Sequence, residues 1–499
     1  MKGAVGAFLP SLEEPLRPGE RRRGEIERRI RGAILAGALS AGVRLPSTRT
    51  LARELHVSRT TAEEAFGQLA AEGYLVRRVG DGTYVSASMP APRPRRASPL
   101  SALPLSARGR ALARAPACVD AVRVLPFRAA HPDYQAFPAA LWNRLQNRRA
   151  RHGGAGLLGY GEAEGLRALR EALAGHLATS RGVRCDPSQV VVLSSSQQGF
   201  DLAARLVLDP GDEAWVEEPG YPGARGALAA AGARVVPVPV DERGIDVAAG
   251  IRLAPRARLA HLTPSHQYPL GSALTLERRL ALLAWAEREG ALLVEDDYDG
   301  EYRYGGRATA SIQGLDRGGR VLYLGTFTKV LFPSLRLAWA VLPEGLVEPF
   351  VQARRLQDGQ PPGLSQAVAA DFVGEGHLGA HLRRMRALYA ERRDLLEGLL
   401  RAALGEAGRL LGAEAGLHAV LPLAGDDAEV ARRAAERGVE VVPLSTLFAG
   451  PPTARGLVLG YAGLSPDAIR AGSEVLARAV EAAAARERRP AARSRGSTG

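Results

Sequence analysis

Residues 320–336 read RVLYLGTFTKVLFPSLR and contain Lys329, one of only two lysines among the 66 basic residues of the chain. The apolar run Val321–Leu324 predicts a buried strand, and Lys329 follows it in the loop region where open α/β sheets gather their active-site groups. Arginine cannot form a Schiff base, so a lysine kept in an arginine-rich chain indicates that a primary amine is required there. The alternative interpretation is a chance surface lysine.

Strands and helices alternate on both sides of this loop. Helix-like segments such as 276–289 (LERRLALLAWAERE) separate five further apolar runs: 189–196 (QVVVLSSS), 213–219 (EAWVEEP), 233–240 (ARVVPVPV), 257–264 (ARLAHLTP) and 291–298 (ALLVEDDY). This alternation predicts a mostly parallel sheet with helices on both faces. After Val341 helices dominate, and a small α/β part is expected near 417–423 and 438–444.

Length and composition divide the chain into four segments. A chain of 499 residues is too long for one ordinary domain. Residues 87–122 are rich in Pro, Ala, Ser and Arg and lack apolar periodicity, which is typical of a linker. We therefore expect a small domain at 1–86, the linker at 87–122, a large α/β domain at 123–485 and a basic, disordered tail at 486–499.

The net charge of +13 lies outside the large domain. Residues 1–86, 87–122 and 486–499 carry +4, +5 and +4, whereas 123–485 hold 41 basic and 41 acidic residues. A basic end on a neutral body indicates a polyanionic partner for that end. A general drift toward arginine is the alternative explanation.

Other compositional features exclude several protein classes. A hydrophobic content of 46% and a charged content of 24% exclude wholesale disorder. No run approaches the ~20 apolar residues of a membrane span, and the N-terminus lacks a secretion signal. Cys118 and Cys185 alone support neither a disulfide framework nor a structural zinc site, and we predict no metal. We expect a soluble cytoplasmic protein.

Residues 21–86 predict a winged helix-turn-helix, that is, three helices followed by a hairpin. Isoleucines recur at helical spacing within 21–39, and Ser47 is placed to cap a second helix. A third helix is expected from about Arg59 to Glu72, with Thr60 and Glu63 at capping-box spacing. Two short strands, 74–78 and 83–86, flank a turn that contains Gly80, Asp81 and Gly82.

The third helix of a winged helix enters the major groove, so donors at its start are candidate DNA contacts. The predicted DNA-binding residues are Ser58, Arg59, Thr60 and Thr61 on this helix, Ser47 and Arg49 at the second helix, and Gly82 in the wing, where no Cβ blocks a backbone approach. The alternative is that these residues are ordinary caps and solvated arginines.

The amino-acid sequence of residues 21–86 resembles that of a known family. The runs LPSTRTLARELHVSRTT (45–61) and GDGT (80–83) are similar to the GntR-type winged-helix repressor domain, and the similarity covers about seventy residues. Two residues depart from the usual pattern. Ala62 stands where a larger aliphatic residue is usual, and Asp81 lies between the wing glycines.

Polar residues also follow other strands of the large domain. Asp296 and Tyr298 end the run 291–298, where a carboxylate could keep a pyridine nitrogen protonated and a tyrosine could bond a phenolic oxygen. Ser195, Ser196 and Gln197 stand where a strand passes into a helix N-terminus that could bind phosphate. Arg336 could assist there, and the Tyr221 ring could stack on the pyridine.

Each of these positions has a structural alternative. The acidic residues could form a solvated strand end or a weak cation site. Arg336 could form an ion pair at the sheet edge, and Tyr221 could be a turn tyrosine packed on its neighbours.

Together these residues resemble the fold-type I aminotransferases, which bind pyridoxal 5′-phosphate, from about Phe127 to Leu476. The resemblance implies that Lys329 forms the internal aldimine, that Asp296 pairs with the pyridine nitrogen and that Tyr298 bonds the phenolic oxygen. It also implies that Tyr221 stacks on the ring and that the protein is a homodimer. The residues that would hold the phosphate are Ser196, Gln197, Thr326, Thr328 and Arg336, together with Tyr160 of the partner subunit.

The fusion of the two parts resembles the MocR-type branch of the GntR regulators, but three positions depart from the aminotransferases. Tyr268 replaces an asparagine that touches the phenolic oxygen, and Ser195 replaces a glycine of the phosphate loop. Val458 stands where amino-acid aminotransferases carry the arginine that binds the substrate carboxylate. Arg225 and Arg455 are possible substitutes for that arginine.

We therefore predict a dimeric transcriptional regulator that binds operator DNA through residues 20–86. It would sense an amine by aldimine exchange at Lys329, or sense pyridoxal phosphate itself. The alternatives are an aminotransferase with an appended DNA-binding domain and a structural DNA-binding protein that has lost its cofactor. Tyr268 and Val458 favour a regulator that retains at most a weak transaminase half-reaction, whereas the intact lysine and acidic residues oppose loss of the cofactor.

Overall fold

The computed structural model describes residues 22–87, 105–114, 125–129, 131–305 and 310–487. The chain divides into two compact units, residues 1–104 and 105–499. Cys118 and residues 488–499 of the predicted tail lie outside the described residues. The predicted boundaries of the four segments therefore stay predictions.

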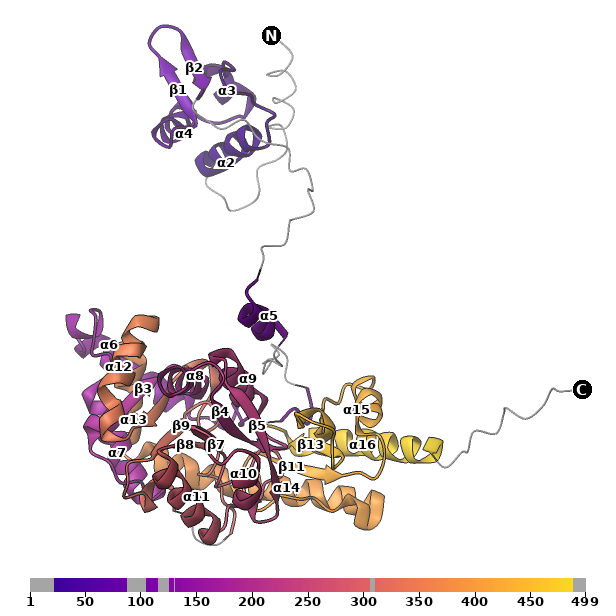
Figure 1. Cartoon of the computed structure of the whole chain (residues 1–499). Coiled ribbons are helices and arrows are strands. Elements are labelled where there is room, and N and C mark those ends of the chain that lie inside the picture. The colour runs from indigo at the N-terminus through magenta and orange to yellow at the C-terminus, as the bar shows by residue number, and fades with distance from the viewer. Residues whose placement is uncertain (1–21, 88–104, 115–124, 130, 306–309, 488–499) are drawn as a thin grey trace, which may run out of the picture. The chain divides into compact units, whose positions relative to one another are not determined.

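The N-terminal unit contains the three helices and the hairpin of a winged helix-turn-helix (Figure 1). Isoleucines from the first helix pack with Phe66 and Leu69 of the third in one buried cluster. The two strands are antiparallel, with Leu75 opposite Val85. The elements are α2 (Arg22–Leu35), α3 (Thr48–Glu54), α4 (Arg59–Ala71), β1 (Leu75–Arg78) and β2 (Gly82–Val85).

The start of α4 differs from the sequence-based expectation. Ser58 caps the helix, because its Oγ accepts a hydrogen bond from the Thr61 backbone N–H at 3.0 Å. The predicted capping box of Thr60 and Glu63 was wrong, since the helix has already begun at Arg59. Glu63 instead binds Arg77 of the hairpin at 2.8 Å.

The segment predicted to be a linker contains a helix. Helix α5 (Ala107–Arg114) belongs to the larger unit and contacts α9 (Pro222–Ala231). Its sequence, ARGRALAR, has only eight residues, three of them arginine, which is too short for the sustained periodicity that indicates a helix. Residues 88–104 and 115–124 lie outside the described residues.

The larger unit is built on an eight-stranded sheet of order β3-β10-β9-β8-β7-β4-β5-β6. The five strands β9, β8, β7, β4 and β5 are parallel, and β10 runs antiparallel to both of its neighbours. The predicted α/β fold is confirmed. The strands are β3 (Val190–Leu193), β4 (Glu213–Glu218), β5 (Arg234–Asp241), β6 (Gly244–Ile245), β7 (Leu259–Leu262), β8 (Leu292–Asp297), β9 (Val321–Thr326) and β10 (Ala338–Val341).

Helices cover both faces of this sheet because alternate strand residues point to opposite sides. Val191 and Leu193 of β3 pack with α8 (Ser196–Val207), α9 and α12 (Glu344–Asp358), whereas Val190 and Val192 pack with α7 (Arg167–Ser180) and α13 (Gly363–Gly374). At the other end, Trp215 of β4 stacks on Trp285 with a centroid distance of 3.9 Å. The helices at that end are α10 (Val247–Leu253) and α11 (Leu276–Glu289).

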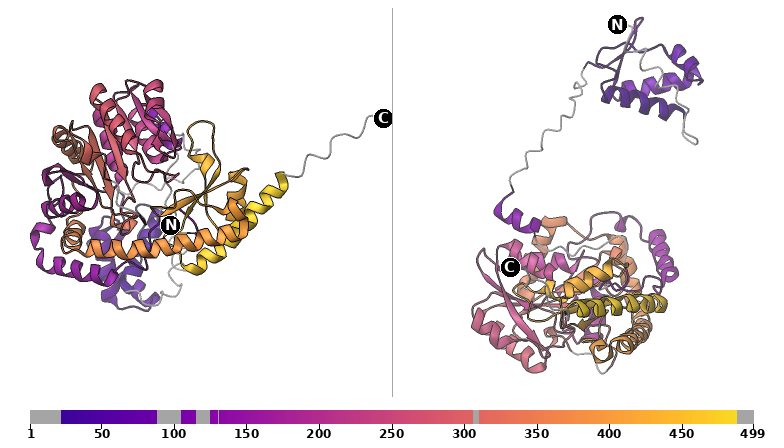
Figure 2. Two further views of the ribbon diagram at one scale, coloured as in Figure 1. Left: turned by 90° about the horizontal axis from the view of Figure 1, so that it is seen from below. Right: turned by 90° about the vertical axis from the view of Figure 1, so that its right-hand side faces the viewer.

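A smaller C-terminal part carries the antiparallel sheet β11-β13-β12. Its long helices α14 and α16 contact each other and run side by side beneath the sheets (Figure 2). The elements are α14 (His377–Leu404), β11 (His418–Pro422), α15 (Asp427–Ala435), β12 (Val442–Pro443), β13 (Gly456–Gly460) and α16 (Pro466–Glu487).

The remaining elements are α6 (Ala139–His152) and six short 3₁₀ turns. These turns are η1 (Ala155–Leu157), η2 (Pro187–Gln189), η3 (Gln313–Leu315), η4 (Pro333–Leu335), η5 (Gly405–Gly408) and η6 (Leu444–Leu447). Among the described residues no helix has the length and apolar character needed to span a bilayer.

One buried ion pair holds the carboxyl ends of the central strands together. Arg181, at the end of α7, donates from Nε to Asp297 Oδ2 at 2.6 Å and from Nη2 to Ser265 Oγ at 2.6 Å. The Tyr323 hydroxyl of β9 donates to the same carboxylate at 2.7 Å. Both side chains of the ion pair are only 2% exposed. The pair therefore joins residues of β8 and β9 and the segment after β7.

We expect Arg181→Met to destabilise the larger unit by about 3–5 kcal/mol, because it leaves the Asp297 carboxylate buried without its cation. Denaturant unfolding of the full chain measures this loss. Arg205→Met is the matched control, because its pair with Asp201 is exposed (59% and 31%) and contributes at most about 1 kcal/mol. Equal effects of the two substitutions would contradict the role of Arg181.

Candidate functional site

The polar residues singled out in the sequence meet at one edge of the large sheet. Strands β4, β7, β8 and β9 are parallel, so the segments that follow them lie at the same edge. β3 also runs in this direction, because β10 is antiparallel to both β3 and β9. Ser196, Tyr221, Tyr268, Asp296 and Lys329 all end or follow one of these strands. The topology thus brings them to a common region.

Asp296 has a free acceptor inside the protein. Its side chain is buried, its Oδ2 lies 3.7 Å from His261 Nε2, and its Oδ1 is buried with no hydrogen-bond partner among the described residues. Burial raises the pKa of Asp296, and the partial countereffect of His261 does not cancel it. A buried carboxylate with a spare oxygen suits a cationic ring nitrogen, which would satisfy both its charge and its lone pair.

The candidate phosphate-binding groups lie at the start of α8 and after β9. Ser195 caps α8, accepting from the Gln198 backbone N–H at 3.2 Å, so the first-turn amides of Ser196 and Gln197 remain at a helix N-terminus. The Gln197 side chain donates to Gly223 O at 2.8 Å.

The groups after β9 complete this set. Thr326 is buried, and its Oγ1 accepts from the Thr328 backbone N–H at 3.0 Å. Arg336 is exposed in the left-handed backbone region at φ 53°, without an ion pair in the part of the chain that the structure describes. The alternative of a sheet-edge ion pair for Arg336 therefore receives no support.

Three rings lie around that of Tyr268. The Tyr268 ring lies 6.0 Å from Tyr221, 6.2 Å from Tyr298 and 5.4 Å from His418, in edge-to-face contacts. The Tyr298 hydroxyl donates to His266 O at 3.0 Å. The charge of Lys329 contributes to lowering the pKa of His418, one of these rings.

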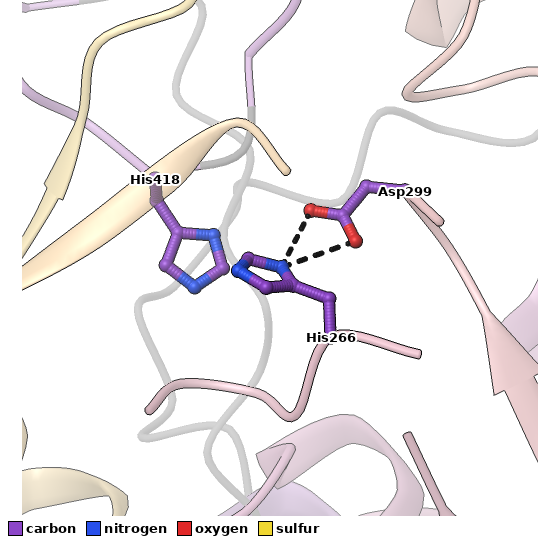
Figure 3. Close-up of side chains that lie close together, drawn as sticks. All are labelled: His266, Asp299 and His418. Atoms are coloured by element: carbon purple, nitrogen blue, oxygen red, sulfur yellow. Dashed lines mark hydrogen bonds and ion pairs between the residues drawn. The ribbon is translucent and has the colours of Figure 1, made fainter. Parts of the chain in front are cut away.

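His266, Asp299 and His418 form a buried group (Figure 3). The Tyr298 hydroxyl lies 3.2 Å from His266 Nδ1. His266 Nδ1 lies 3.1 Å from Asp299 Oδ2, and its Nε2 lies 3.1 Å from Gly412 O. Burial opposes protonation of His266, but the Asp299 carboxylate outweighs it and raises the pKa. Burial and the His266 charge lower the pKa of His418 to about 3. The group is thus an ion pair beside a neutral imidazole.

The same three side chains have donor types and spacing that could hold a metal ion, and the described residues contain no other such group. However, both ring nitrogens of His266 already have acceptors. The pair is also closely packed, because a Cβ at Gly416 would lie 2.3 Å from His266 Cε1. We therefore assign these residues to an ion pair and a neutral imidazole, not to a metal centre.

Tyr160 lies on the surface of the larger unit. Its side chain is fully exposed, and Leu158 (89%) and Leu356 (81%) are also exposed. Gln360 joins these regions, because it binds the Gly161 backbone N–H and donates to Gly159 O at 3.4 Å. Three large exposed side chains on connected segments are typical of a surface that another molecule covers.

Arg225 and Arg455, the possible substitutes for the arginine that binds the substrate carboxylate in aminotransferases, both contact other groups. Arg455 lies 3.6 Å from Asp427 Oδ1, and Arg225 donates to Leu447 O at 3.4 Å. Val458 is fully buried in β13, opposite Val420 of β11.

In the N-terminal unit the arginines divide into two groups. Those on α2 and β1 mostly have acidic partners, such as Arg31 with Glu72 at 2.6 Å. Arg44, Arg49, Arg53 and Arg59 form no ion pair among the described residues, and all four are exposed. Arg49, Arg53 and Arg59 lie on α3 and at the start of α4, and Arg44 lies beside Gly82 of the wing. These elements therefore carry exposed arginines that no ion pair holds in the described part of the chain.

The predicted DNA-binding residues lie on or beside these same elements. Ser47 and Ser58 are the caps of α3 and α4, and their Oγ atoms accept from the Thr50 and Thr61 backbone N–H groups. Arg59 and Thr60 are exposed in the first turn of α4. Gly82 has φ 131°, and an added Cβ would lie 2.9 Å from Arg44 Nε, so a side chain there would displace that cation.

Comparisons with known proteins agree with the assignment of both the winged helix and the larger unit. Residues 22–85 match the bacterial regulatory proteins of the gntR family, and residues 129–473 match aminotransferase class I and II. The chain is 42% identical over 452 residues to the probable rhizopine catabolism regulatory protein MocR of Rhizobium meliloti, covering 90% of this chain and 91% of that protein.

The chain belongs to the MocR-type branch of the GntR family of transcriptional regulators.

Two further similarities support this family. The HTH-type transcriptional regulator TauR of Rhodobacter capsulatus is 36% identical, with 92% of this chain and 97% of TauR covered. The larger unit is similar to LysN, an α-aminoadipate aminotransferase of Thermus thermophilus solved with N-(5′-phosphopyridoxyl)-L-leucine. That match has a TM-score of 0.67 and 30% identity, and it covers 76% of this chain and 96% of LysN. The cofactor of the larger unit is pyridoxal phosphate.

Sequence reasoning missed several residues of this MocR-type pocket. His261 beside Asp296, and the pair His266–Asp299, were not predicted. Arg181 was also missed, because it lies 116 residues from Asp297 in the chain. The runs LAHL (259–262) and TPSHQ (263–267) did place histidines at the end of a buried strand, which was the available signal.

Arg59 and Arg49 are expected to affect DNA binding differently. If Arg59 contacts a base, Arg59→Ala weakens binding to the operator by about 1–3 kcal/mol and leaves non-specific binding less affected. If Arg49 contacts phosphate, Arg49→Ala weakens all sequences similarly and lowers the salt dependence. Gel-shift titrations at several salt concentrations measure both effects.

The matched control is Arg31→Ala, because Arg31 on α2 is paired with Glu72. Full DNA affinity of both the Arg49 and Arg59 variants would rule out this surface as the DNA-reading element.

Proposed function

We propose that this regulator detects a primary amine through the cofactor bound at Lys329 and alters its binding to operator DNA in response. When bound, pyridoxal phosphate supplies an aldehyde carbon that a primary amine can hold as a C=N bond. Lys329 would hold this carbon in a C=N bond, and an incoming primary amine would take its place and release the lysine side chain as a free amine. The exchange needs no oxidant or second substrate.

The residues of the pocket support this proposal by their positions. We assign Asp296 to the ring nitrogen on the strength of its unsatisfied buried oxygen, and Tyr221 to the ring face. Tyr298 would turn its hydroxyl from His266 O to the phenolic oxygen. The phosphate would be held by Ser196, Gln197, Thr326, Thr328 and Arg336.

A specific contact suggests how the pocket could act on the DNA-binding unit. Tyr221 is the residue that precedes α9, and α9 contacts α5 of the connecting segment. A movement of Tyr221 on ligand exchange would therefore reach the chain that leads to the winged helix. We propose that ligand binding in this way repositions two winged helices on a two-part operator in the cytoplasm.

We also propose that the regulator is a homodimer in which Tyr160 of each subunit completes the partner's phosphate site. The full exposure of Tyr160 together with Leu158 and Leu356 supports this arrangement.

Pyridoxal phosphate as the effector itself is the second candidate. It is favoured by the burial of Val458 in place of a cation, because the pocket then needs no second ligand.

Lys329→Ala should abolish the borohydride-reducible link between protein and cofactor while the protein stays folded, because Lys329 is the only lysine between residues 3 and 499. Mass spectrometry of the reduced, digested protein locates the adduct. Lys2→Arg is the matched control and should retain the adduct. An adduct on Lys2, or on neither lysine, would disprove the assignment.

The amine proposal and the pyridoxal phosphate alternative differ in one measurement. If an amine is the effector, operator affinity of the cofactor-loaded protein changes on addition of that amine. If pyridoxal phosphate is the effector, operator affinity changes on loading the cofactor and no further on adding amines.

Leu158→Asp should weaken the dimer, because it places a charge in the surface that we assign to the partner subunit. Sedimentation velocity at micromolar concentration measures the shift toward monomer. Leu276→Asp is the control, since Leu276 on α11 is 60% exposed and outside that surface. A monomeric wild-type protein with cofactor bound would contradict the dimer.

A further inference from the structure

A buried cluster without charged groups lies behind Tyr268. It consists of Val420, Leu444, Leu447, Phe448 and Val458, each at most 8% exposed, with Tyr268 packed against them. We refer to these five residues as the apolar wall. The Tyr268 ring also contacts the rings of Tyr221, Tyr298 and His418. Tyr268 therefore connects the wall to the groups assigned to the cofactor.

Strand alternation explains why this wall is apolar. Leu457 and Leu459 of β13 pack into the main core, so Val458 between them points to the opposite face. There it is paired with Val420 of β11 and Val442 of β12. The wall is built into the small sheet, and its composition cannot change by rotation of a side chain.

Two of the three cations near this wall are paired with acids. Arg455 lies 3.6 Å from Asp427 Oδ1, and both ring nitrogens of His266 face acceptors, Asp299 and Gly412 O. The Arg225 guanidinium donates to the carbonyl of Leu447 at 3.4 Å, so a carboxylate could reach it only by replacing that contact.

The remaining charged groups near Tyr298 are acidic. Glu217, Asp296 and Asp299 are 3%, 5% and 1% exposed, and all three act electrostatically on Tyr298. A carboxylate brought into this space would lose its water and lie near these three acids, of which Asp299 is paired with His266. A cationic amine would meet favourable charges and the faces of tyrosine rings.

We propose that the ligand is a primary amine that carries no carboxylate, and that the apolar wall together with the three buried acids excludes amino acids. This inference rests on the proposed exchange at Lys329. Tyr268 and Val458 are then the residues that determine ligand class. The covalent step is the same exchange of one C=N bond for another.

The experiment compares amines with the amino acids that differ from them only by the carboxylate. The pairs are ethylamine and L-alanine, phenethylamine and L-phenylalanine, and cadaverine and L-lysine. Each compound is titrated into the full-length, cofactor-loaded protein, and binding is followed by cofactor absorbance and by thermal stability. Concentrations are expressed as free base, and the same titrations with free pyridoxal phosphate provide the intrinsic preference of the chemistry.

We expect the amine to bind at least about tenfold more tightly than its amino acid, after division by the preference of free pyridoxal phosphate, in every pair that reacts. Equal or tighter binding of the amino acids would overturn the inference and leave exchange at Lys329 intact. A lack of reaction with all six compounds would overturn the proposed exchange as well, so the two failures are distinguishable.

A substitution in the wall provides a second measurement. Val458→Arg should reduce or reverse the preference for the amine, because it places a cation beside Tyr268, whereas the volume control Val458→Leu should retain it. The preference of the wild-type protein decides the inference even if Val458→Arg does not fold. A folded Val458→Arg variant with an unchanged preference would count against the wall as its cause.

Discussion

The buried pair of Arg181 and Asp297 is the constraint on which the cofactor pocket depends. A charge removed from water must be matched closely by its partner, so the guanidinium determines the position of everything bonded to it. It donates to Asp297 at the end of β8, to Ser265 after β7 and to Gly300 O. The Tyr323 hydroxyl of β9 donates a hydrogen bond to the same Asp297 carboxylate. The three strand ends that carry the pocket are thereby held at one spacing.

Successive side chains of β8 point to opposite faces of the sheet, so Asp296 lies on the other face from Glu295 and Asp297. Glu295 accepts the backbone N–H groups of Ile312 and Gln313 at 2.8 and 2.9 Å, and Asp297 meets Arg181. Asp296, between them, points to the opposite face, toward His261, and keeps one oxygen unsatisfied. Three adjacent carboxylates thus have different partners because a strand turns each successive side chain to the other side. Asp297 Oδ1 also lacks a hydrogen-bond partner among the described residues, but the Asp297 carboxylate is already matched by Arg181 and Tyr323, whereas no guanidinium matches that of Asp296.

The two units of the chain use charge in different ways. In the winged helix, arginines paired with acids stabilise the small fold, and those without partners gather on α3, the start of α4 and the wing. In the larger unit, buried pairs such as Arg181 with Asp297 and His266 with Asp299 lie near the cofactor groups, and Tyr268 connects those groups to the apolar wall. The first arrangement suits a long-range attraction to a polyanion, and the second suits discrimination among small ligands.

The sequence by itself determined the order of elements, the winged helix, the mostly parallel sheet, and the positions of Lys329, Asp296 and the start of α8. These follow from local patterns, namely apolar periodicity, capping serines and polar residues after buried strands. It could not show that Ser58, not Thr60, caps α4, because both residues carry hydroxyl side chains at suitable spacing near the start of the helix. Nor did it reveal helix α5, which has only eight residues within a segment rich in Pro, Ala, Ser and Arg.

Only the tertiary structure decided which side chains are partners across long separations. Arg181 meets Asp297, His266 meets Asp299, and Arg455 is drawn to Asp427 away from Val458. Whether a buried charge is matched or free depends on distances of a few ångströms between segments far apart in the chain. Local sequence carries no record of those distances, so the charge balance of the pocket became visible only in the folded chain.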